Sequence, residues 1–338
     1  MTGSSRDGVV LGIDGGGTRT RAVLVDAGGT VLGVGVAEGS NVHDVGPTVA
    51  GRHLRAAVER AWAVREGAPR RIVAAGFCLA GLVTDADRTV AMAAVAEAGL
   101  LTDGTILVLD HDGAAAVAGA HLGDPGLVLI AGTGSACYGR GVDGAVLRVG
   151  GWGWWFGDEG SGAWLGREAL VAVAEATDGR GSATALSAAV LEQLECSDAD
   201  ELLYRVYVRG LDRAGTASLA PLVFVSAAER DAVASAIVQR AADHLARAVE
   251  AAVRAIGTER PPLALVGGVA TAAAMRAPLD RALERRGVDV DIVDAAVAPP
   301  FGAALLALER RGPVTTGTLE TLCGTSRRWD DALRGAQR

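Results

Sequence analysis

Four of the six tryptophans lie in one short segment, residues 150–164, beside two adjacent acidic residues. The segment reads GGWGWWFGDEGSGAW and contains Trp152, Trp154, Trp155, Asp158, Glu159 and Trp164. An indole ring can lie on the apolar C–H face of a sugar, and a carboxylate can accept hydrogen bonds from sugar hydroxyls. A carbohydrate pocket and a packed corner of a domain both fit this segment, so the rest of the chain must separate the two.

Two glycine-rich turns have the composition of a phosphate-binding site. One reads DGGGTRT from residue 14, and the other reads GTGS from residue 132. Because glycine has no Cβ atom, backbone N–H groups can close on a phosphate, and neighbouring hydroxyls add donors. The candidate ligands are Gly16, Gly17, Thr18 and Thr20 in the first turn and Gly132, Thr133, Gly134 and Ser135 in the second. A tight hairpin uses the same residues, but two such turns at corresponding places favour a phosphate clamp.

Aspartates follow two of the apolar runs. Asp14 ends the first run and could hold Mg²⁺ through water, since Mg²⁺ prefers oxygen ligands and retains several waters; a turn aspartate is the alternative. Asp110 and Asp112 follow a later run, at the start of a helix expected near Gly113. Either a general base for transfer to a hydroxyl or a helix N-cap explains such an acid. We interpret His111, between them, as a neighbour and not as a base.

The elements that position these residues occur in a pattern that is repeated. Apolar runs at 9–14, 21–26 and 30–37 predict a meander, followed by a helix at 47–66, a strand at 71–81, a helix at 89–99 and a strand at 105–110. The strand–turn–strand pattern returns at 126–141, with a third run at 145–150. Helices at 227–256, 271–286 and 300–311 and strands at 262–268 and 288–295 follow. Alternating strands and helices predict an α/β fold, here internally duplicated.

Composition excludes several classes of protein. The 338 residues correspond to roughly two domains, and a net charge of -8 with no lysine argues against a nucleic-acid partner. Without lysine the chain has neither a P-loop nor Schiff-base chemistry. We expect no membrane partner and a cytoplasmic location, because no apolar run reaches the ~18–20 residues of a membrane helix and the first residues lack a signal-peptide pattern. The four cysteines are scattered and predict reduced, buried thiols.

Five blocks, in order, resemble the N-acetylglucosamine kinase family, in the BadF/BadG-type ATPase branch of the actin, hexokinase and heat-shock chaperone superfamily. They read LGIDGGGTRTRAVLVD, VLDHDGAAA, VLIAGTGS, GGWGWWFGDEGS and LALVGGVA, within residues 11–304. The resemblance implies a duplicated actin-like ATPase (ribonuclease H-like) fold, with two lobes around a nucleotide cleft and ATP and Mg²⁺ as cofactors. The expected lobes are 1–118 with a returning helix at 300–312, and 119–299; the placement of 313–338 is uncertain.

The same resemblance implies roles for individual residues. Asp112 aligns with the catalytic base, and Gly267 and Gly268 align with the adenosine turn. The implied sugar contacts are Asn41, Asp112, Ser135, Gly151, Trp152 and Asp158. Trp154, Trp155 and Trp164 are expected to pack. Ala136 departs from the asparagine that some members carry next to the substrate, which leaves room for glucosamine or another hexose.

We therefore expect an ATP-dependent kinase. The resemblance implies two partners, a small-molecule sugar substrate and a second copy of the chain. The acceptor is the 6-hydroxyl of N-acetylglucosamine or of a close relative such as glucosamine. Two alternatives remain at this point: an ATPase activator of an acyl-CoA dehydratase or reductase system, which bridges subunits with a cysteine-held iron–sulfur cluster, and a non-catalytic sugar sensor. About eight residues precede the first strand, too few for the helix-turn-helix that such sensors carry.

Overall fold

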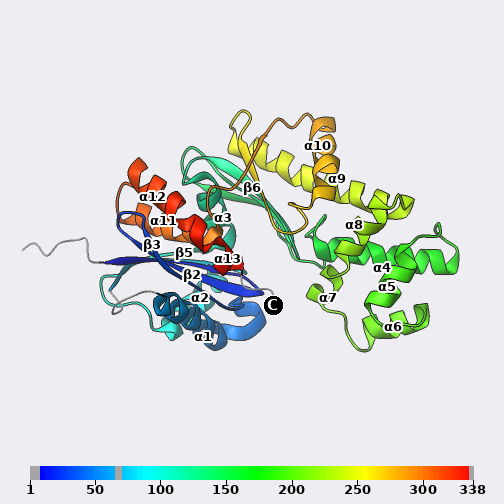
Figure 1. Cartoon of the computed structure of the whole chain (residues 1–338), viewed down its shortest axis with the longest axis horizontal. Helices are drawn as coiled ribbons and strands as arrows, with labels where there is room; N and C mark the ends of the chain where they lie inside the picture. Colours follow the sequence, from blue (N-terminus) through cyan, green and yellow to red (C-terminus); the bar gives the residue numbers. More distant parts are fainter. Residues whose placement is uncertain (1–7, 65–70, 335–338) are drawn as a thin grey trace, which may run out of the picture. The chain divides into compact units, whose positions relative to one another are not determined.

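The computed structural model describes residues 8–64 and 71–334. The chain forms two compact units, which are described separately below (Figure 1). Unit 1 comprises Met1–Asp124 and Asp294–Arg338, and unit 2 comprises Pro125–Val293.

Each unit contains a five-stranded sheet with the same topology. The sheet of unit 1 has the order β3-β2-β1-β4-β5 and that of unit 2 the order β10-β9-β6-β7-β8. In unit 1 the strands are β1 (Val9–Gly15), β2 (Arg19–Asp26), β3 (Val31–Glu38), β4 (Ile72–Leu79) and β5 (Ile106–His111). In unit 2 they are β6 (Gly126–Ala131), β7 (Ser135–Arg140), β8 (Val146–Gly150), β9 (Pro262–Val266) and β10 (Asp291–Val293). In both sheets the first three strands pair antiparallel to one another. The fourth strand pairs in parallel with the first, and the fifth pairs in parallel with the fourth. The predicted duplication is therefore confirmed.

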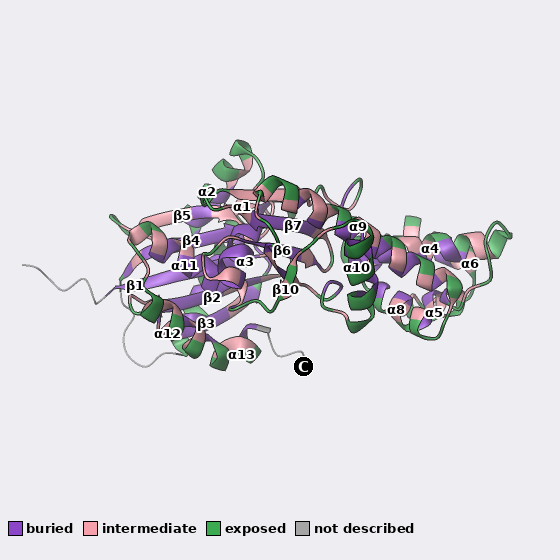
Figure 2. Cartoon of the chain, turned by 90° about the horizontal axis from the view of Figure 1, so that it is seen from above, coloured by how far each residue is buried: buried purple, intermediate pink, exposed green. Residues whose placement is uncertain are grey.

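In unit 1, helices cover both faces of the sheet (Figure 1). Helices α1 (Val42–Ala63) and α2 (Asp85–Ala98) lie on one face, and α3 (Asp112–His121) and α11 (Pro299–Arg311) lie on the other. Helix α11 packs closely against α3 and β1, and glycines permit this close approach. A Cβ atom on Gly302 would stand 2.0 Å from the Ala115 carbonyl oxygen, and one on Gly12 would stand 2.2 Å from the Pro300 carbonyl oxygen. Strand β1, nearly all of β4 and residues 113–120 of α3 are buried, whereas most of β5 is half-buried (Figure 2).

The C-terminal segment that the sequence left unplaced belongs to unit 1. It forms α12 (Thr316–Ser326), a 3₁₀ turn (Arg327–Trp329) and α13 (Asp330–Arg334). The Arg328 Nη2 group donates to the Val31 carbonyl oxygen at 2.9 Å, and Arg21 Nε donates to that of Leu333 at 3.0 Å. These bonds attach the segment to β2 and β3.

In unit 2, the helices form a large apolar core with the sheet. They are α4 (Gly162–Asp178), α5 (Leu186–Gln193), α6 (Ala199–Tyr207), α7 (Arg213–Ala217), α8 (Ala220–Ala228), α9 (Ala232–Ile256) and α10 (Ala273–Arg285). The single helix expected at 227–256 is wrong at its start, because Arg230 takes φ 67° and Asp231 caps a new helix. Within the described residues of both units, no helix is long and apolar enough to cross a membrane.

Candidate active site

The predicted site residues of unit 1 lie at one edge of its sheet, where β1, β3, β4 and β5 end. Asp14 of β1 is in register with Cys78 of β4, and Cys78 is in register with Asp110 of β5. Asp112 follows β5 directly, and Asn41 follows β3. The topology therefore brings Asp14, Asn41 and Asp112 to the edge that carries the first glycine turn.

Asp14 is a nearly buried carboxylate, with 10% of its side chain exposed. Burial raises its pKa to about 6; the Arg21 guanidinium, whose Nη1 lies 3.1 Å from Asp14 Oδ2, opposes this rise, and the charge of Asp112 adds to it. Asp14 and Asp112 therefore repel one another, and a cation between them would remove the repulsion. Two carboxylates are ligands of the type that Mg²⁺ takes, through water or directly, so the donor set fits the expected ion.

Asp112 is not the N-cap of α3. The helix begins at Asp112 itself, and the N-cap is His111, whose Nδ1 accepts a hydrogen bond from the Ala114 N–H group at 3.0 Å. Asp112 Oδ1 accepts from the N–H group of Gly113 at 2.9 Å. The capping alternative thus applies to His111, which the sequence analysis treated only as a neighbour, and Asp112 stands half-buried in the first helical turn.

Asn41 caps α1, and its Oδ1 accepts from the His43 N–H group at 3.0 Å. The imidazole Nε2 of His43 lies 3.0 Å from both the Gly81 carbonyl oxygen and Asp87 Oδ1. A Cβ atom on Gly81 would stand 2.7 Å from Asn41 Oδ1. Asn41 therefore has a structural role in addition to the sugar contact expected of it, because its Oδ1 atom caps α1 and lies against the loop after β4.

The first glycine turn exposes only part of its predicted ligand set. Thr20 is fully buried, and its hydroxyl donates to the Glu38 carbonyl oxygen at 2.7 Å, so it ties the start of β2 to the end of β3. The Gly16 N–H group donates to the Arg19 carbonyl oxygen at 2.9 Å. Gly17 and Thr18 are exposed, and among the described residues their N–H groups have no acceptor. These two groups remain available for an anion.

The second glycine turn is held from behind by the start of α4. The N–H groups of Gly162 and Ala163 donate to the carbonyl oxygens of Gly132 and Thr133 at 2.7 and 3.2 Å. Within the described part of the chain, the N–H groups of Thr133 and Gly134 have no acceptor. A turn whose carbonyl groups are bound inward and whose N–H groups are open is suited to an anion.

The predicted adenosine turn lies beside this second turn. The N–H groups of Val269 and Ala270 donate to the Ala131 carbonyl oxygen at 2.9 and 3.0 Å. Gly267 takes φ 95°, and a Cβ atom there would stand 2.5 Å from the same oxygen. Because β6 and β9 are parallel neighbours, the two glycine segments meet at their carboxyl ends. Gly268 has open space around its Cβ position.

Asp158 is the most constrained of the predicted sugar ligands. Only 4% of its side chain is exposed, it has the left-handed φ of 55°, and its Oδ2 accepts from Arg213 Nη2 at 2.8 Å. Burial raises its pKa, while Arg213 and the N–H groups of Gly153 and Ser135 oppose the rise. The sequence analysis missed Arg213, which no motif marks. The Ser135 hydroxyl donates to the Glu159 carbonyl oxygen at 2.9 Å, a second bond between the turn and this loop.

The aromatic residues of the opening segment have different environments. Trp164 is buried edge-on against His244, with ring centroids 5.2 Å apart, as a packing residue should be. Trp155 was expected to pack but is 78% exposed, so that expectation is wrong; its ring stands 4.8 Å from that of Trp154. Trp152 is 62% exposed and lies 5.3 Å below the Arg148 guanidinium. In the GWGWWF stretch that follows β8, the exposed rings are those of Trp152, Trp155 and Phe156.

Gly151 and Ala136 lie together at the base of this loop. Gly151 takes φ 69°, and its Cβ position is 3.1 Å from the Ala136 methyl group. Ala136 is buried. A larger side chain at position 136 would therefore reach the loop that carries Trp152, which makes this position a sensitive one for the shape of unit 2 near the second turn.

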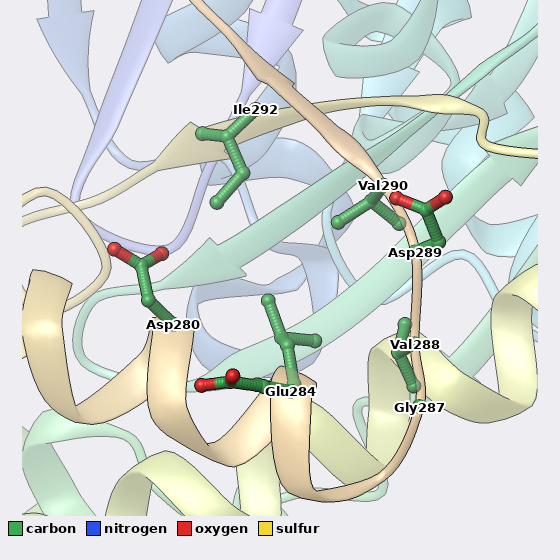
Figure 3. Close-up of a pocket in the computed structure, with 8 residues that line it drawn as sticks. Asp280, Glu284, Gly287, Val288, Asp289, Val290 and Ile292 are labelled. Carbon is green, nitrogen blue, oxygen red and sulfur yellow. The ribbon is translucent and has the colours of Figure 1, made fainter.

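A separate groove of about 400 Å³ in unit 2 contains none of these residues (Figure 3). It lies between α10 and the strand β10, and Asp280, Glu284 and Asp289 bring carboxylates to it. Asp280 is already paired with Arg276 at 3.0 Å. Among the described residues, no group of three or more histidine, cysteine, aspartate or glutamate side chains is arranged to hold a metal ion.

Comparison with known proteins agrees with this arrangement. Residues 11–307 match the BadF/BadG/BcrA/BcrD ATPase family. The chain is 28% identical to an N-acetyl-D-glucosamine kinase of Dictyostelium discoideum, over 90% of this chain and 98% of that protein. It is 30% identical to an N-acetylmuramic acid/N-acetylglucosamine kinase of Clostridium acetobutylicum, over 77% and 85%.

A solved structure from Chromobacterium violaceum, assigned as an N-acetylglucosamine kinase, is 31% identical and has a TM-score of 0.70; the match covers 89% of this chain and 98% of that one. The two matching five-stranded sheets and this likeness establish the two-lobed α/β fold of the actin-like ATPases. The chain is a member of the BadF/BadG/BcrA/BcrD ATPase family.

Proposed function

We propose that this protein is a carbohydrate kinase that transfers the γ-phosphoryl group of ATP to the 6-hydroxyl of N-acetylglucosamine or of a close relative such as glucosamine. One observation carries the proposal: Asp14 and Asp112 stand at the same sheet edge, close enough to influence one another, beside a turn whose exposed N–H groups at Gly17 and Thr18 have no acceptor among the described residues. The similarity to kinases over most of the chain supports it.

In this proposal Asp112 is the general base. A carboxylate in the first turn of a helix is favoured by the helix dipole, and it can accept the proton of the attacking hydroxyl. Asp14 would hold Mg²⁺, which supplies charge neutralisation for the phosphates when bound. The open N–H groups of the two glycine turns orient the phosphates, and most of the rate acceleration in such a transfer comes from positioning and electrostatics.

Unit 2 would recognise the sugar and the adenosine. Asp158 accepts hydrogen bonds from ring hydroxyls, Gly151 and Trp152 line the sugar, and Asn41 of unit 1 contributes an amide. Gly267 and Gly268 form the adenosine turn. Ala136 has no amide group that could bind a 2-acetamido group. Glucosamine is therefore as good a candidate acceptor as N-acetylglucosamine, and both sugars are tested.

The alternative of an ATPase activator is not favoured. Such a protein holds an iron–sulfur cluster between subunits through cysteine, whereas Cys137, the cysteine in the strand after the second glycine turn, is fully buried. The proposed kinase also takes a second copy of the chain as a partner, an expectation carried by the resemblance alone; light scattering of the purified protein tests it.

The experiment is ADP release from Mg-ATP by the purified protein, offered N-acetylglucosamine, glucosamine, N-acetylmannosamine, glucose or no sugar. Turnover that requires a sugar supports the proposal and names the acceptor. The matched control for Asp112→Asn is Asp110→Asn, since Asp110 lies two residues away at the end of β5. Sugar-independent ATP hydrolysis, or no hydrolysis with any sugar, would contradict the proposal. Chemical analysis of the phosphorylated product establishes which hydroxyl was modified.

A further inference from the structure

An ion pair between Asp158 and Arg213 joins the loop after β8 to α7, with Arg213 Nη2 2.8 Å from Asp158 Oδ2. The carboxylate is almost fully buried, whereas the guanidinium is 43% exposed. A buried carboxylate that loses its cation keeps its desolvation cost and gains nothing in return. The state of Asp158 therefore depends on Arg213.

The local structure holds Arg213 in place. It is the first residue of α7, whose N-cap Asp212 accepts from the Gly215 N–H group at 2.7 Å. The helix in turn lies directly on α4, because a Cβ atom on Gly166 would stand 1.9 Å from the Thr216 carbonyl oxygen. The backbone of Arg213 is thus fixed to the helix that begins behind the second glycine turn.

The pair also lies against that turn. A Cβ atom on Gly134 would stand 2.0 Å from Arg213 Nη2 and 2.7 Å from Asp158 Oδ2. Glycine at this position is what allows the pair to approach. The left-handed φ of Asp158 is a strained conformation for a residue with a side chain, and such strain is found mainly at functional sites.

Resting on the function proposed above, we propose that Arg213 is a positioning residue for Asp158: it occupies Oδ2 so that Oδ1 is held toward the sugar as a charged acceptor. An ionised carboxylate accepts at both oxygens, whereas a protonated one must donate at one of them. The charged group facing Asp158 from α7 is Arg213, and Glu159 is the neighbouring acid along its own loop. Without the guanidinium, the effects of burial and of Glu159 on the carboxylate are opposed only by the N–H groups of Gly153 and Ser135.

The test compares Arg213→Ala and Arg213→Lys with the unchanged protein, using the sugar identified by the ADP-release panel. We expect Arg213→Ala to raise the KM for sugar about tenfold, as for loss of a charged partner, and to leave the KM for ATP unchanged. The acid limb of the kcat/KM profile should move to higher pH, because the carboxylate then protonates more readily. Arg213→Lys should retain the limb and part of the sugar affinity, because it keeps the charge.

The control is Arg285→Ala, which breaks the pair of Arg285 with Asp243 at 2.7 Å elsewhere in unit 2; Arg285 is about as exposed as Arg213, whereas Asp243 lies at the surface and Asp158 is buried. A purely structural role for Arg213 would lower the melting temperature and leave the pH limb in place. That result would overturn the proposal, as would an unchanged sugar KM or a changed KM for ATP alone. If Arg213→Ala fails to fold, Arg213→Lys and Arg213→Gln carry the same comparison. If the wild-type protein shows no sugar-dependent turnover, the proposed function itself is wrong. This outcome differs from the outcomes above, which all require an active wild-type protein.

Discussion

The two glycine turns occupy the same place in two sheets of identical topology, yet their charges come from different parts of the chain. In unit 1 the cross-strand neighbours just before the turn are Asp14 and Arg21, an ion pair on β1 and β2. In unit 2 the corresponding neighbours before the turn are Ile130 and Ala136, both apolar. At this position the duplicated scaffold therefore carries a charged pair in unit 1 and an apolar pair in unit 2.

Unit 2 obtains its charges from outside the sheet. Asp158 comes from the loop after β8, and Arg213 comes from α7. A charge fixed on paired strands stays in one place when surrounding loops change, while a charge on a loop moves with that loop. We therefore expect changes in unit 1 to reduce kcat and changes in unit 2 to raise the KM for sugar.

The largest effect should come from unit 1. Asp112→Asn removes the proposed base and should lower kcat about a thousandfold, within the range typical of general-base residues, while the KM for sugar changes by less than about threefold because the amide keeps the shape. Steady-state kinetics with saturating Mg-ATP measure both constants. Asp110→Asn should leave kcat near that of the unchanged protein. Equal losses in the two variants would show that charge at this edge, and not the base itself, sets the rate.

The counterpart in unit 2 is Asp158→Asn. Loss of a charged acceptor should raise the KM for sugar between about ten- and a hundredfold, with a much smaller change in kcat. Tryptophan fluorescence during sugar titration measures the same loss without turnover, since Trp152 and Trp154 lie in the same loop. A lower kcat with an unchanged KM for sugar would contradict this prediction, because it would assign a catalytic role to Asp158 of unit 2.

The same substitution in both turns sharpens the comparison further. Gly134→Ala meets Arg213 and Asp158 at 2.0 and 2.7 Å, whereas Gly16→Ala meets only the Arg19 carbonyl oxygen at 3.2 Å. We expect Gly134→Ala to lower kcat/KM about tenfold and Gly16→Ala about threefold or less, because misplacing a positioning group is costly. Assays under identical conditions give the ratio. A larger loss for Gly16→Ala would mean that the first turn is the tighter one.

The smallest effect concerns the thiols, of which each unit has one buried and one half-buried. Burial raises the pKa of Cys137 to about 12 and that of Cys78 well above its usual range, so both stay protonated and unreactive at pH 8. Alkylation of the folded protein should therefore be confined to Cys196 and Cys323 and should leave turnover unchanged. Peptide mass spectrometry identifies the modified residues, and denatured protein, in which all four should react, is the control. Rapid labelling of Cys78 would reveal opening of unit 1.

Local patterns were sufficient for the strands and for their duplication. Apolar runs and glycine turns are encoded within a few neighbouring residues, and so the strands β1 to β10, a helix starting near Gly113 and the two turns follow from the sequence, whereas helices α4 to α8 and α12 were not predicted. The boundaries were less accurate where capping decided them: the break at Arg230 and Asp231 divides an apolar, helix-forming stretch, and the periodicity continues across it.

What the sequence by itself determined is which groups are candidates for the proposed reaction: a carboxylate at the end of each of two strands, two glycine turns and a tryptophan-rich acidic loop. Only the tertiary structure decided how they are held. The pairing of Asp14 with Arg21 depends on strand register, and that of Asp158 with Arg213 joins residues 55 apart in the chain. Such contacts are set by the packing of helices and strands against one another, a property that no short stretch of sequence contains.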